Sequence, residues 1–455
     1  MIDFNKIIDY FKSTPIPQNM LNRGQLVLNE FFNPIKVLFE QKAVPKEPWS
    51  DEQIKFFLQT LSNMDTDKDF KAARVGEREA RIASKIHLKT SAGFCHGIGR
   101  SGFLTAPQPK APGGSIMYEV TNYLARNFLK KFGLPNIKSA IVAPLCTGMS
   151  LALCIGALRP DWNNKDLIDK RTVLVPQIDH KSLIKGLELM GVKRKTIEGR
   201  IFGDAVRIPV EDIKLSMDKD CFAVISVTSF FPPREHDDIK EISKFAKEND
   251  LVHIVINAYG IQSSEWMDLI RSGIDAGRID AIIQSTDKNV LSPVGGAIIA
   301  SPDKEIINKI SQAYAGRASA TPVVNFLISM LSLGTKGYKR LMNTQQKNRK
   351  LLEEKMSEVA SKLNERILDV FNPVAVAMSL KNLKKEHLSS LGGALYNLRV
   401  TGPRVYNPEE DVFGTCCSNY LTPYIVMNAA IGATSEDIVL AVERFEKAYA
   451  QITQK

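Results

Sequence analysis

Long apolar runs are missing from this sequence of 455 residues, and none reaches the roughly 20 residues that a membrane-spanning helix needs. Cysteine is also scarce: the chain has six, with no C-x-x-C pair and no histidine partners at zinc-site spacing. We therefore expect free thiols, no disulfide framework and no bound metal. The first residues, MIDFNKIIDYFKSTPIPQ, contain acidic side chains and no signal-peptide pattern, so we expect a cytoplasmic protein without a membrane partner.

A moderate excess of positive charge is present. Lysine and arginine number 60 against 50 acidic residues, which gives a formal net charge of +10. This excess is compatible with an anionic partner, but it favours nucleic acid only weakly. Hydrophobic residues make up 44% of the chain, as in a globular protein, and a chain of this length predicts two or three domains.

Short apolar segments alternate with helical patterns between residues 115 and 320. Helices lie between most of these segments, which predicts an α/β fold with a mostly parallel sheet covered by helices on both faces. The predicted strands are 139–145, 171–177, 193–197, 221–227, 251–257, 280–284 and 296–300. Ligands of such a sheet bind at the carboxyl ends of the strands, so the residues that follow each strand are the candidate site.

Four strand ends carry suitable side chains. Thr147 and Gly148 open an apolar helix, whose free amides and dipole suit a phosphate group, although an ordinary helix cap is as good an explanation. His180 could stack on a flat ring, but a lone histidine is more often structural. Asn257 could hydrogen-bond to a ring nitrogen. Lys288 lies before a Pro-Val-Gly-Gly turn, which predicts a hairpin-like return of the chain. Lysines at strand ends usually just reach water. The alternative is a lysine that forms a Schiff base with a cofactor.

The order of these features on successive strands is more specific than any one of them. A phosphate site, a stacking histidine, a partner for a ring nitrogen and a lysine together indicate a pyridoxal-phosphate enzyme of the aspartate-aminotransferase-like fold. Many such enzymes have an aspartate where this chain has Asn257, and asparagine can only hydrogen-bond to the ring nitrogen. We therefore expect a reaction with a good leaving group rather than transamination.

Residues 91–114 form a long segment rich in glycine and proline. The stretch 97–102 matches GxGxxG, but no strand precedes it, so it is weak as a dinucleotide fingerprint. Its polar residues Arg100, Ser101 and Gln108 lie among glycines and suit an anion cradle, with a flexible surface loop as the alternative.

Helical patterns flank this central region. Ser50 to Gln53 has the pattern of a capping box, and an apolar stripe over residues 31–39 suggests packing on another subunit or in a local core. After residue 320, a long helical stretch leads to a smaller α+β segment. Its basic residues are expected to form a solvated helix face rather than a nucleic-acid contact; they are Lys336, Lys339, Arg340, Lys347, Arg349 and Lys350.

Longer stretches resemble one family nearly end to end: the O-phosphoseryl-tRNA(Sec) selenium transferases. The similar stretches are VGEREARIAS, HGIGRSG, Gln-Pro-Lys at 108–110, TGMSL, NAYGIQSS, GRIDAIIQSTDKN, PVGGAIIA and AGRASATP. The resemblance implies a fold-type-I pyridoxal-phosphate transferase that acts on tRNA(Sec) charged with O-phosphoserine. It also implies elimination of phosphate, addition of selenium from selenophosphate, and formation of selenocysteinyl-tRNA(Sec).

The resemblance also implies roles for particular residues. Lys288 would bind the cofactor, and Arg78 would contact it from a neighbouring subunit. Thr147, Gly148, His180 and Asn257 are the cofactor contacts expected from their strand ends. The TGPR stretch at 401–404 resembles the family segment that reads the tRNA discriminator base, which implies that role for Arg404. The implied contacts of the substrate phosphate are Arg100, Ser101, Gln108 and Arg317.

A homotetramer joined partly through the N-terminal helices is implied as well. The expected domains are a helical extension for oligomerisation and tRNA contact (1–90), a phosphate-binding loop (91–114), a catalytic α/β domain that binds pyridoxal phosphate (115–320) and a C-terminal α+β domain (321–455). Two alternatives stay open. One is another fold-type-I enzyme, such as a decarboxylase or a phosphoseryl-to-cysteinyl-tRNA converter, and the other is a non-catalytic tRNA-binding relative. No DNA partner is expected.

Overall fold

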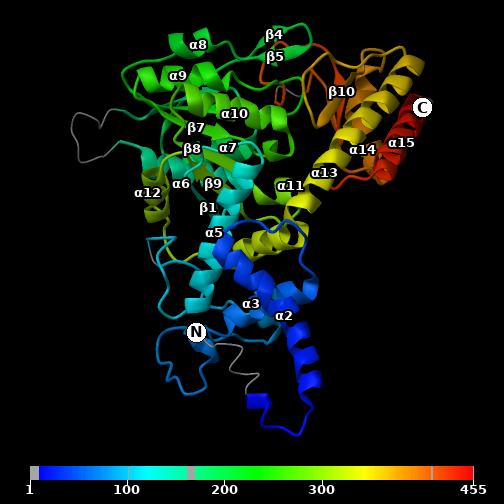
Figure 1. The fold of residues 1–455 in the computed structure, drawn as a ribbon. Helices are drawn as coiled ribbons and strands as arrows, with labels where there is room; N and C mark the ends of the chain where they lie inside the picture. The colour runs from blue at the N-terminus through cyan, green and yellow to red at the C-terminus, as the bar shows by residue number, and fades with distance from the viewer. Residues whose placement is uncertain (1–9, 101, 161–169, 411–412, 454–455) are drawn as a thin grey trace.

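The computed structural model describes residues 10–100, 102–160, 170–410 and 413–453. A seven-stranded sheet with the order β1-β9-β8-β7-β6-β2-β3 lies at its centre (Figure 1). Only β9 runs antiparallel to its neighbours, so the predicted mostly parallel sheet is confirmed. The strands lie within one or two residues of their predicted ends: β1 (Ser139–Ala143), β2 (Thr172–Pro176), β3 (Lys193–Ile197), β6 (Cys221–Val227), β7 (Val252–Ile256), β8 (Ala281–Ser285) and β9 (Ala297–Ser301).

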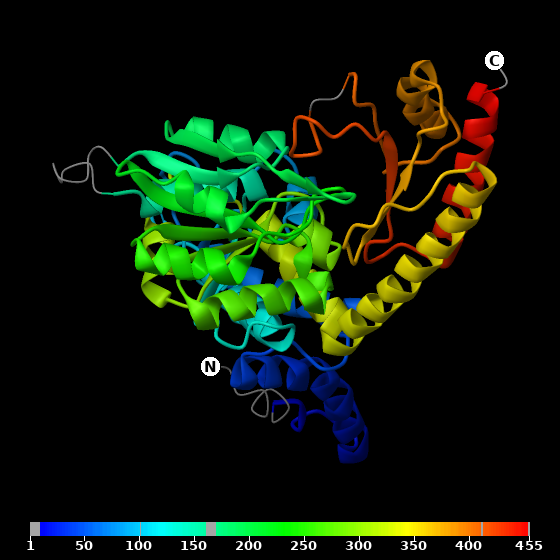
Figure 2. The same ribbon diagram turned by 90° about the horizontal axis from the view of Figure 1, so that it is seen from above.

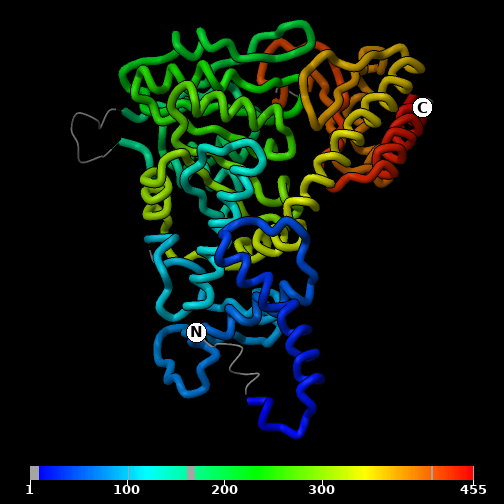
Figure 3. The backbone as a smooth tube through the Cα atoms, in the orientation of Figure 1, coloured from blue at the N-terminus to red at the C-terminus, as the bar shows by residue number. Residues whose placement is uncertain are grey.

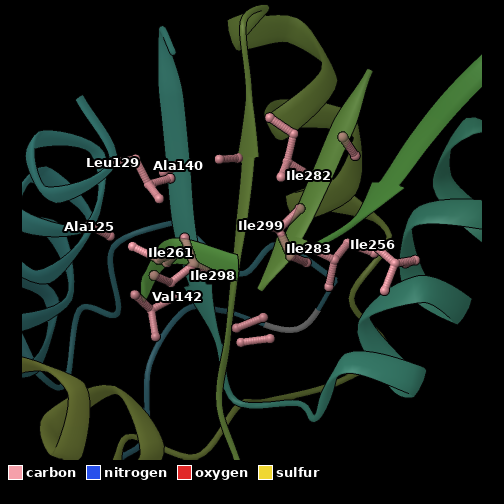
Figure 4. Close-up of a cluster of buried hydrophobic side chains, with 14 of the residues drawn as sticks. Ala125, Leu129, Ala140, Val142, Ile256, Ile261, Ile282, Ile283, Ile298 and Ile299 are labelled. Atoms are coloured by element: carbon pink, nitrogen blue, oxygen red, sulfur yellow. The ribbon is translucent and has the colours of Figure 1, made fainter. Parts of the chain in front are cut away.

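Helices cover both faces of this sheet, as Figure 2 shows. They are α5 (Pro112–Lys131), α6 (Thr147–Leu158), α7 (Lys181–Leu189), α8 (Val210–Leu215), α9 (Ile239–Glu248), the 3-10 turn η2 (Gly260–Gln262), α10 (Ser264–Ala276), α11 (Thr286–Val290) and α12 (Lys304–Gln312). Because both faces are covered, β8 and β9 are buried along their whole lengths and consist almost entirely of isoleucine, alanine and serine. Their isoleucines pack beside side chains of β1 and α5 in the core (Figure 4).

The hairpin-like return predicted after residue 288 is present. β8 and β9 pair antiparallel, with Ser285 opposite Ala297, and α11 occupies the connection between them. One further element was not predicted, a two-stranded hairpin of β4 (Arg200–Phe202) and β5 (Ala205–Arg207).

The N-terminal helices extend from one end of the α/β body (Figures 1 and 3). They are α2 (Gln18–Gln41), α3 (Asp51–Ser62), the 3-10 turn η1 (Thr66–Lys68) and α4 (Ile86–Thr90). The capping box is confirmed, since the Ser50 hydroxyl accepts from the Gln53 amide and the Ser50 amide donates to the Gln53 side chain. The core of α3 is continuous with that of the sheet, while α2 leaves Leu26 and Val27 more than 60% exposed.

The long helix predicted after residue 320 is α13 (Thr321–Lys362), and it connects the sheet to the C-terminal domain (Figure 1). It bends at Gly334, whose φ of +57° favours glycine and whose added Cβ would lie 2.9 Å from the Glu47 carbonyl carbon. A three-stranded antiparallel sheet follows, with a separate apolar core. Its elements are β10 (Ala375–Ser379), α14 (Lys385–Asn397), β11 (Arg404–Tyr406), β12 (Tyr424–Asn428) and α15 (Ser435–Thr453).

Within the described ranges, no helix combines the length and the apolar character that crossing a membrane would require. The domain boundaries assigned from the sequence stay a prediction.

Candidate active site

Lys288 lies in the short helix α11, directly after the buried strand β8. Its side chain is exposed, and its amine is 6.0 Å from the centre of the Tyr259 ring. The neighbouring Asn289 is buried and holds the turn: its amide nitrogen donates to the carbonyls of Ser285 (2.7 Å) and Ala258 (3.0 Å), and its oxygen accepts from the Ile261 amide. The amine of Lys288 is therefore free to move above a rigid turn.

His180 follows β2 and precedes α7, with its Nδ1 2.7 Å from the Ser182 hydroxyl. Burial, and to a smaller extent the positive charge of Lys288, lower the pKa of His180, so its imidazole is neutral at pH 7. Because β2, β6, β7 and β8 run parallel, His180 after β2 and Lys288 after β8 lie at the same edge of the sheet, the carboxyl ends of the strands.

Thr147 and Gly148 form the first turn of α6, which begins after β1. The preceding Cys146 provides no side-chain cap, and the first turn contains no acidic residue. The backbone amides at the start of α6 are therefore able to bind an anion. An added Cβ on Gly148 would lie 2.6 Å from the Ser182 carbonyl oxygen. Glycine thus allows the start of α6 to lie against the start of α7, next to His180.

Asn257 follows β7 and is fully buried. Its amide oxygen accepts from the Thr228 hydroxyl, and its amide nitrogen donates to the Gln284 side chain at 3.1 Å. Both the oxygen and the nitrogen of this side-chain amide thus already form a hydrogen bond within the protein. A ring nitrogen would have to use the second lone pair of the amide oxygen or replace one of these bonds, so the role predicted for Asn257 stays a prediction.

The glycine-rich loop (91–114) packs against the segment before α13. The Ile98 amide donates to the Ala318 carbonyl at 3.0 Å, which places Arg317 beside the loop. The Gln108 side chain is buried and donates to the Gly99 carbonyl at 3.3 Å.

Three arginines were expected at the site, Arg78 at the cofactor and Arg100 and Arg317 at the substrate phosphate, and all three are exposed. Within the described part of the chain, the side chains of Arg78, Arg100 and Arg317 form no ion pair and no hydrogen bond, which leaves their charges available to an anion. Ser101, another expected contact of the substrate phosphate, lies outside the described residues.

Two buried groups under this loop escaped the sequence reasoning. His96 is 2% exposed, and its Nε2 lies 3.5 Å from a carboxylate oxygen of Asp67. Asp65 accepts the Gly114 amide at 3.0 Å, where the loop passes into α5. Burial is the main cause that lowers the pKa of His96 and raises that of Asp65. No local pattern marks these residues, because their partners are distant in sequence.

Arg404 begins β11 in the C-terminal domain, and its guanidinium donates to the Phe413 carbonyl at 2.7 Å. The next residues of that loop, Gly414 and Cys416, donate their amides to the carboxylate of Asp179. Asp179 immediately precedes His180. The structure therefore brings Arg404 towards the sheet edge that carries His180 and Lys288.

Comparisons with known proteins agree with this arrangement. A family model described as O-phosphoseryl-tRNA(Sec) selenium transferase, SepSecS, matches residues 64–450. The chain is 44% identical over 447 residues to the O-phosphoseryl-tRNA(Sec) selenium transferase of Methanococcus maripaludis, covering 97% of this chain and 99% of the other. The enzyme of that name from Dictyostelium discoideum is 33% identical over 455 residues, covering 92% and 94%.

Solved structures give the same result. The crystal structure of an archaeal O-phosphoseryl-tRNA(Sec) selenium transferase matches with a TM-score of 0.90 and 45% identity, covering 96% of this chain and 98% of the other. A sphingosine-1-phosphate lyase of Burkholderia pseudomallei matches with a TM-score of 0.60 at 12% identity, which shows the shared fold alone. The fold-type-I class predicted from the sequence is confirmed.

Proposed function

This chain belongs to the O-phosphoseryl-tRNA(Sec) selenium transferase family, and from this premise we propose which of its residues perform the reaction. It is a pyridoxal-phosphate-dependent transferase that converts O-phosphoseryl-tRNA(Sec) into selenocysteinyl-tRNA(Sec). The nearly full-length similarity favours this activity over the cysteinyl-forming, decarboxylating and non-catalytic alternatives that the sequence left open.

The residues at the sheet edge fit pyridoxal phosphate. The uncapped start of α6, with Thr147 and Gly148, suits its phosphate, and the neutral imidazole of His180 suits a position against its ring. The exposed amine of Lys288 is the group that would hold it covalently. When bound, this cofactor withdraws electrons from the substrate Cα, which favours loss of the Cα proton and of a leaving group on Cβ.

Once the amine of the substrate has taken its place, the free amine of Lys288 would act as the general base that removes the Cα proton. The observation that carries this role is its exposed amine, which lies above a turn held by Asn289 at the same sheet edge as His180. Asn257 would orient the ring nitrogen by exchanging one of its present hydrogen bonds. Arg78 would contact the cofactor from a neighbouring subunit.

The leaving phosphate of phosphoserine would be received by the glycine-rich loop. Arg100 and Arg317 supply guanidinium groups that pair with none of the described residues, and they lie on two segments joined by the Ile98–Ala318 hydrogen bond. The Gln108 side chain holds the loop by donating to the Gly99 carbonyl, and Ser101, which lies outside the described residues, stays a predicted contact of the phosphate. Arg404 would read the discriminator base of the tRNA.

We also propose selenophosphate as the selenium donor, a homotetramer as the working assembly and the cytoplasm as its location. Exposed apolar side chains on the N-terminal region support an assembly, since Leu26, Val27 and Phe70 would otherwise face water. The six cysteines are free thiols, which agrees with a reducing compartment.

Product identification tests the function and its donor together. The purified protein is incubated with phosphoseryl-tRNA(Sec) and either selenophosphate or sulfide, and the amino acid released from the tRNA is identified by mass spectrometry. We expect selenocysteine with selenophosphate, no product with Lys288→Ala, and parent-like activity with the exposed control Lys304→Ala. Cysteine formed from sulfide as readily as selenocysteine from selenophosphate would contradict the proposed donor.

A further inference from the structure

The carboxylate of Asp179 links the catalytic sheet to the C-terminal domain. Asp179 is 6% exposed and lies between β2 and His180. One carboxylate oxygen accepts the backbone amides of Gly414 and Cys416, both at 2.7 Å, and the other accepts the Gln177 side chain at 3.0 Å. A buried carboxylate with three donors is a firm attachment point, because hydrogen bonds to a charged group are stronger than neutral ones.

The loop that receives Asp179, residues 413–417, is shaped for an anion. Gly414 has a φ of +126° and Cys416 a φ of +62°, and the two amides converge on one carboxylate oxygen. In return, the Asp179 amide donates to the Cys416 sulfur at 3.3 Å. The Cys416 carbonyl also accepts the Gly199 amide at 2.9 Å, so the loop is held to the catalytic domain on both sides.

Arg404 rests on this same loop. Its guanidinium donates to the Phe413 carbonyl at 2.7 Å, and an added Cβ on Gly414 would lie only 1.6 Å from its Nη2 atom. The guanidinium therefore lies directly on the residue whose amide Asp179 holds. The Lys181 amine, next to His180 in sequence, lies 5.8 Å from the Phe413 ring centre and adds a second contact to the loop.

We propose that Asp179 is a positioning residue for tRNA specificity, which fixes the 413–417 loop and thereby the guanidinium of Arg404 at the edge of the catalytic sheet. This inference rests on the proposed role of Arg404 in reading the discriminator base. In this role, Asp179 acts through the 413–417 loop and Arg404 rather than by a contact of its own with tRNA or cofactor. Because Asp179 is adjacent to His180, its bonds to the loop fix the position of Arg404 relative to the cofactor site. The end of the tRNA is then held at a set distance from the reacting groups.

Removal of the carboxylate should affect tRNA use more than chemistry. In Asp179→Ala, the Gly414 and Cys416 amides lose their acceptor, and we expect the KM for phosphoseryl-tRNA(Sec) to rise roughly tenfold to a hundredfold. The preference among tRNAs that differ only at the discriminator base should fall in parallel, while kcat at saturating tRNA and the visible absorbance of the holoenzyme stay near the parent values. Asp179→Asn keeps one acceptor oxygen and should give a smaller change in the same direction.

Asp204 provides a matched control. It also joins the catalytic domain to the C-terminal domain, because it accepts from the Arg366 guanidinium at 2.6 Å and from the Asp369 amide at 2.9 Å, but it does not bond to the 413–417 loop. Asp204→Asn should lower thermal stability as much as Asp179→Asn or more, yet leave the discriminator preference unchanged. Equal loss of preference in both variants would overturn the proposal, because it would reduce Asp179 to a general domain contact.

A double-mutant cycle completes the test on the holoenzyme. If Asp179 acts through Arg404, Asp179→Asn should leave KM and base preference unaltered in a protein that already carries Arg404→Ala. If the change in KM of the double variant instead equals the product of the two single changes to within about twofold, the two residues act independently and the coupling is overturned. An Asp179→Asn variant with parent-like KM and preference, beside an impaired Arg404→Ala, would overturn the inference alone. Parent-like discrimination by Arg404→Ala would instead overturn the proposed role of Arg404, and the inference with it.

Discussion

Replacement of Arg100 by alanine should separate phosphate recognition from folding. Arg100 is exposed, and in the described structure its side chain bonds to no other group. The local backbone is held independently of that side chain, because the amide and carbonyl of Arg100 pair with Phe103. We therefore expect the free energy of unfolding to change by no more than about 0.5 kcal/mol.

The expected loss of activity is much larger. A hydrogen bond from a guanidinium to a phosphate dianion contributes about 1.5–3 kcal/mol. Because 1.36 kcal/mol is a factor of ten, loss of this contact should lower kcat/KM for phosphoseryl-tRNA(Sec) roughly tenfold to a hundredfold. Arg100→Lys keeps the charge but loses the planar pair of donors, so it should fall between alanine and the parent.

The assay compares substrates with and without the phosphate. Selenocysteinyl-tRNA formation gives kcat/KM, and competition by seryl-tRNA(Sec) gives the affinity for a ligand that lacks the phosphate. Arg100→Ala should lower kcat/KM for phosphoseryl-tRNA(Sec) and leave the affinity for seryl-tRNA(Sec) unchanged. Its assembly state should be that of the parent. Equal loss for both ligands, or a loss that follows dissociation of the assembly, would refute the role of Arg100 in binding phosphate.

Three further results are expected. Lys288→Ala should abolish turnover while changing the thermal unfolding temperature little, because its side chain is exposed; measurable turnover would exclude it as the base. Mixed assemblies of Lys288→Ala and Arg78→Ala chains should regain part of the activity if sites are shared between subunits, and properly mixed assemblies without activity would show self-contained sites. His253 is buried with its pKa lowered to about 4, so the unfolded chain binds a proton below about pH 6.5 that the folded protein does not. Stability should therefore fall by up to about 3 kcal/mol between pH 6.5 and 4, and His253→Gln should flatten this slope in unfolding experiments.

The central sheet was predictable because its strands are buried on both faces. Six of them appear in the sequence as short apolar runs, and β3 (KRKTI), which is mostly exposed, was found from its place in the strand–helix alternation, so all seven were found. The β4–β5 hairpin was missed, since β4 is exposed along its three residues and has no alternating pattern. The bend of α13 at Gly334 was also not predicted, because it depends on packing against residues near Glu47, which are distant in sequence.

Much of the candidate site followed from the rule that ligands bind where parallel strands end. That rule selected Lys288 and His180, which the structure brings to one edge. It gave no sign of Asp179 as a structural link, because its acceptor role depends on Gly414, 235 residues away. The present hydrogen bonds of Asn257 within the sheet were equally invisible, since they are set by Thr228 and Gln284 on neighbouring strands.

The attachment site of the cofactor tests the account most directly. The purified holoenzyme is treated with borohydride, digested with a protease, and searched by mass spectrometry for the peptide that carries the pyridoxyl group. The account predicts a single modified residue, Lys288, in the peptide that contains STDKNV. A pyridoxyl group on any other lysine, or a holoenzyme whose cofactor is lost without a modified peptide, would contradict it.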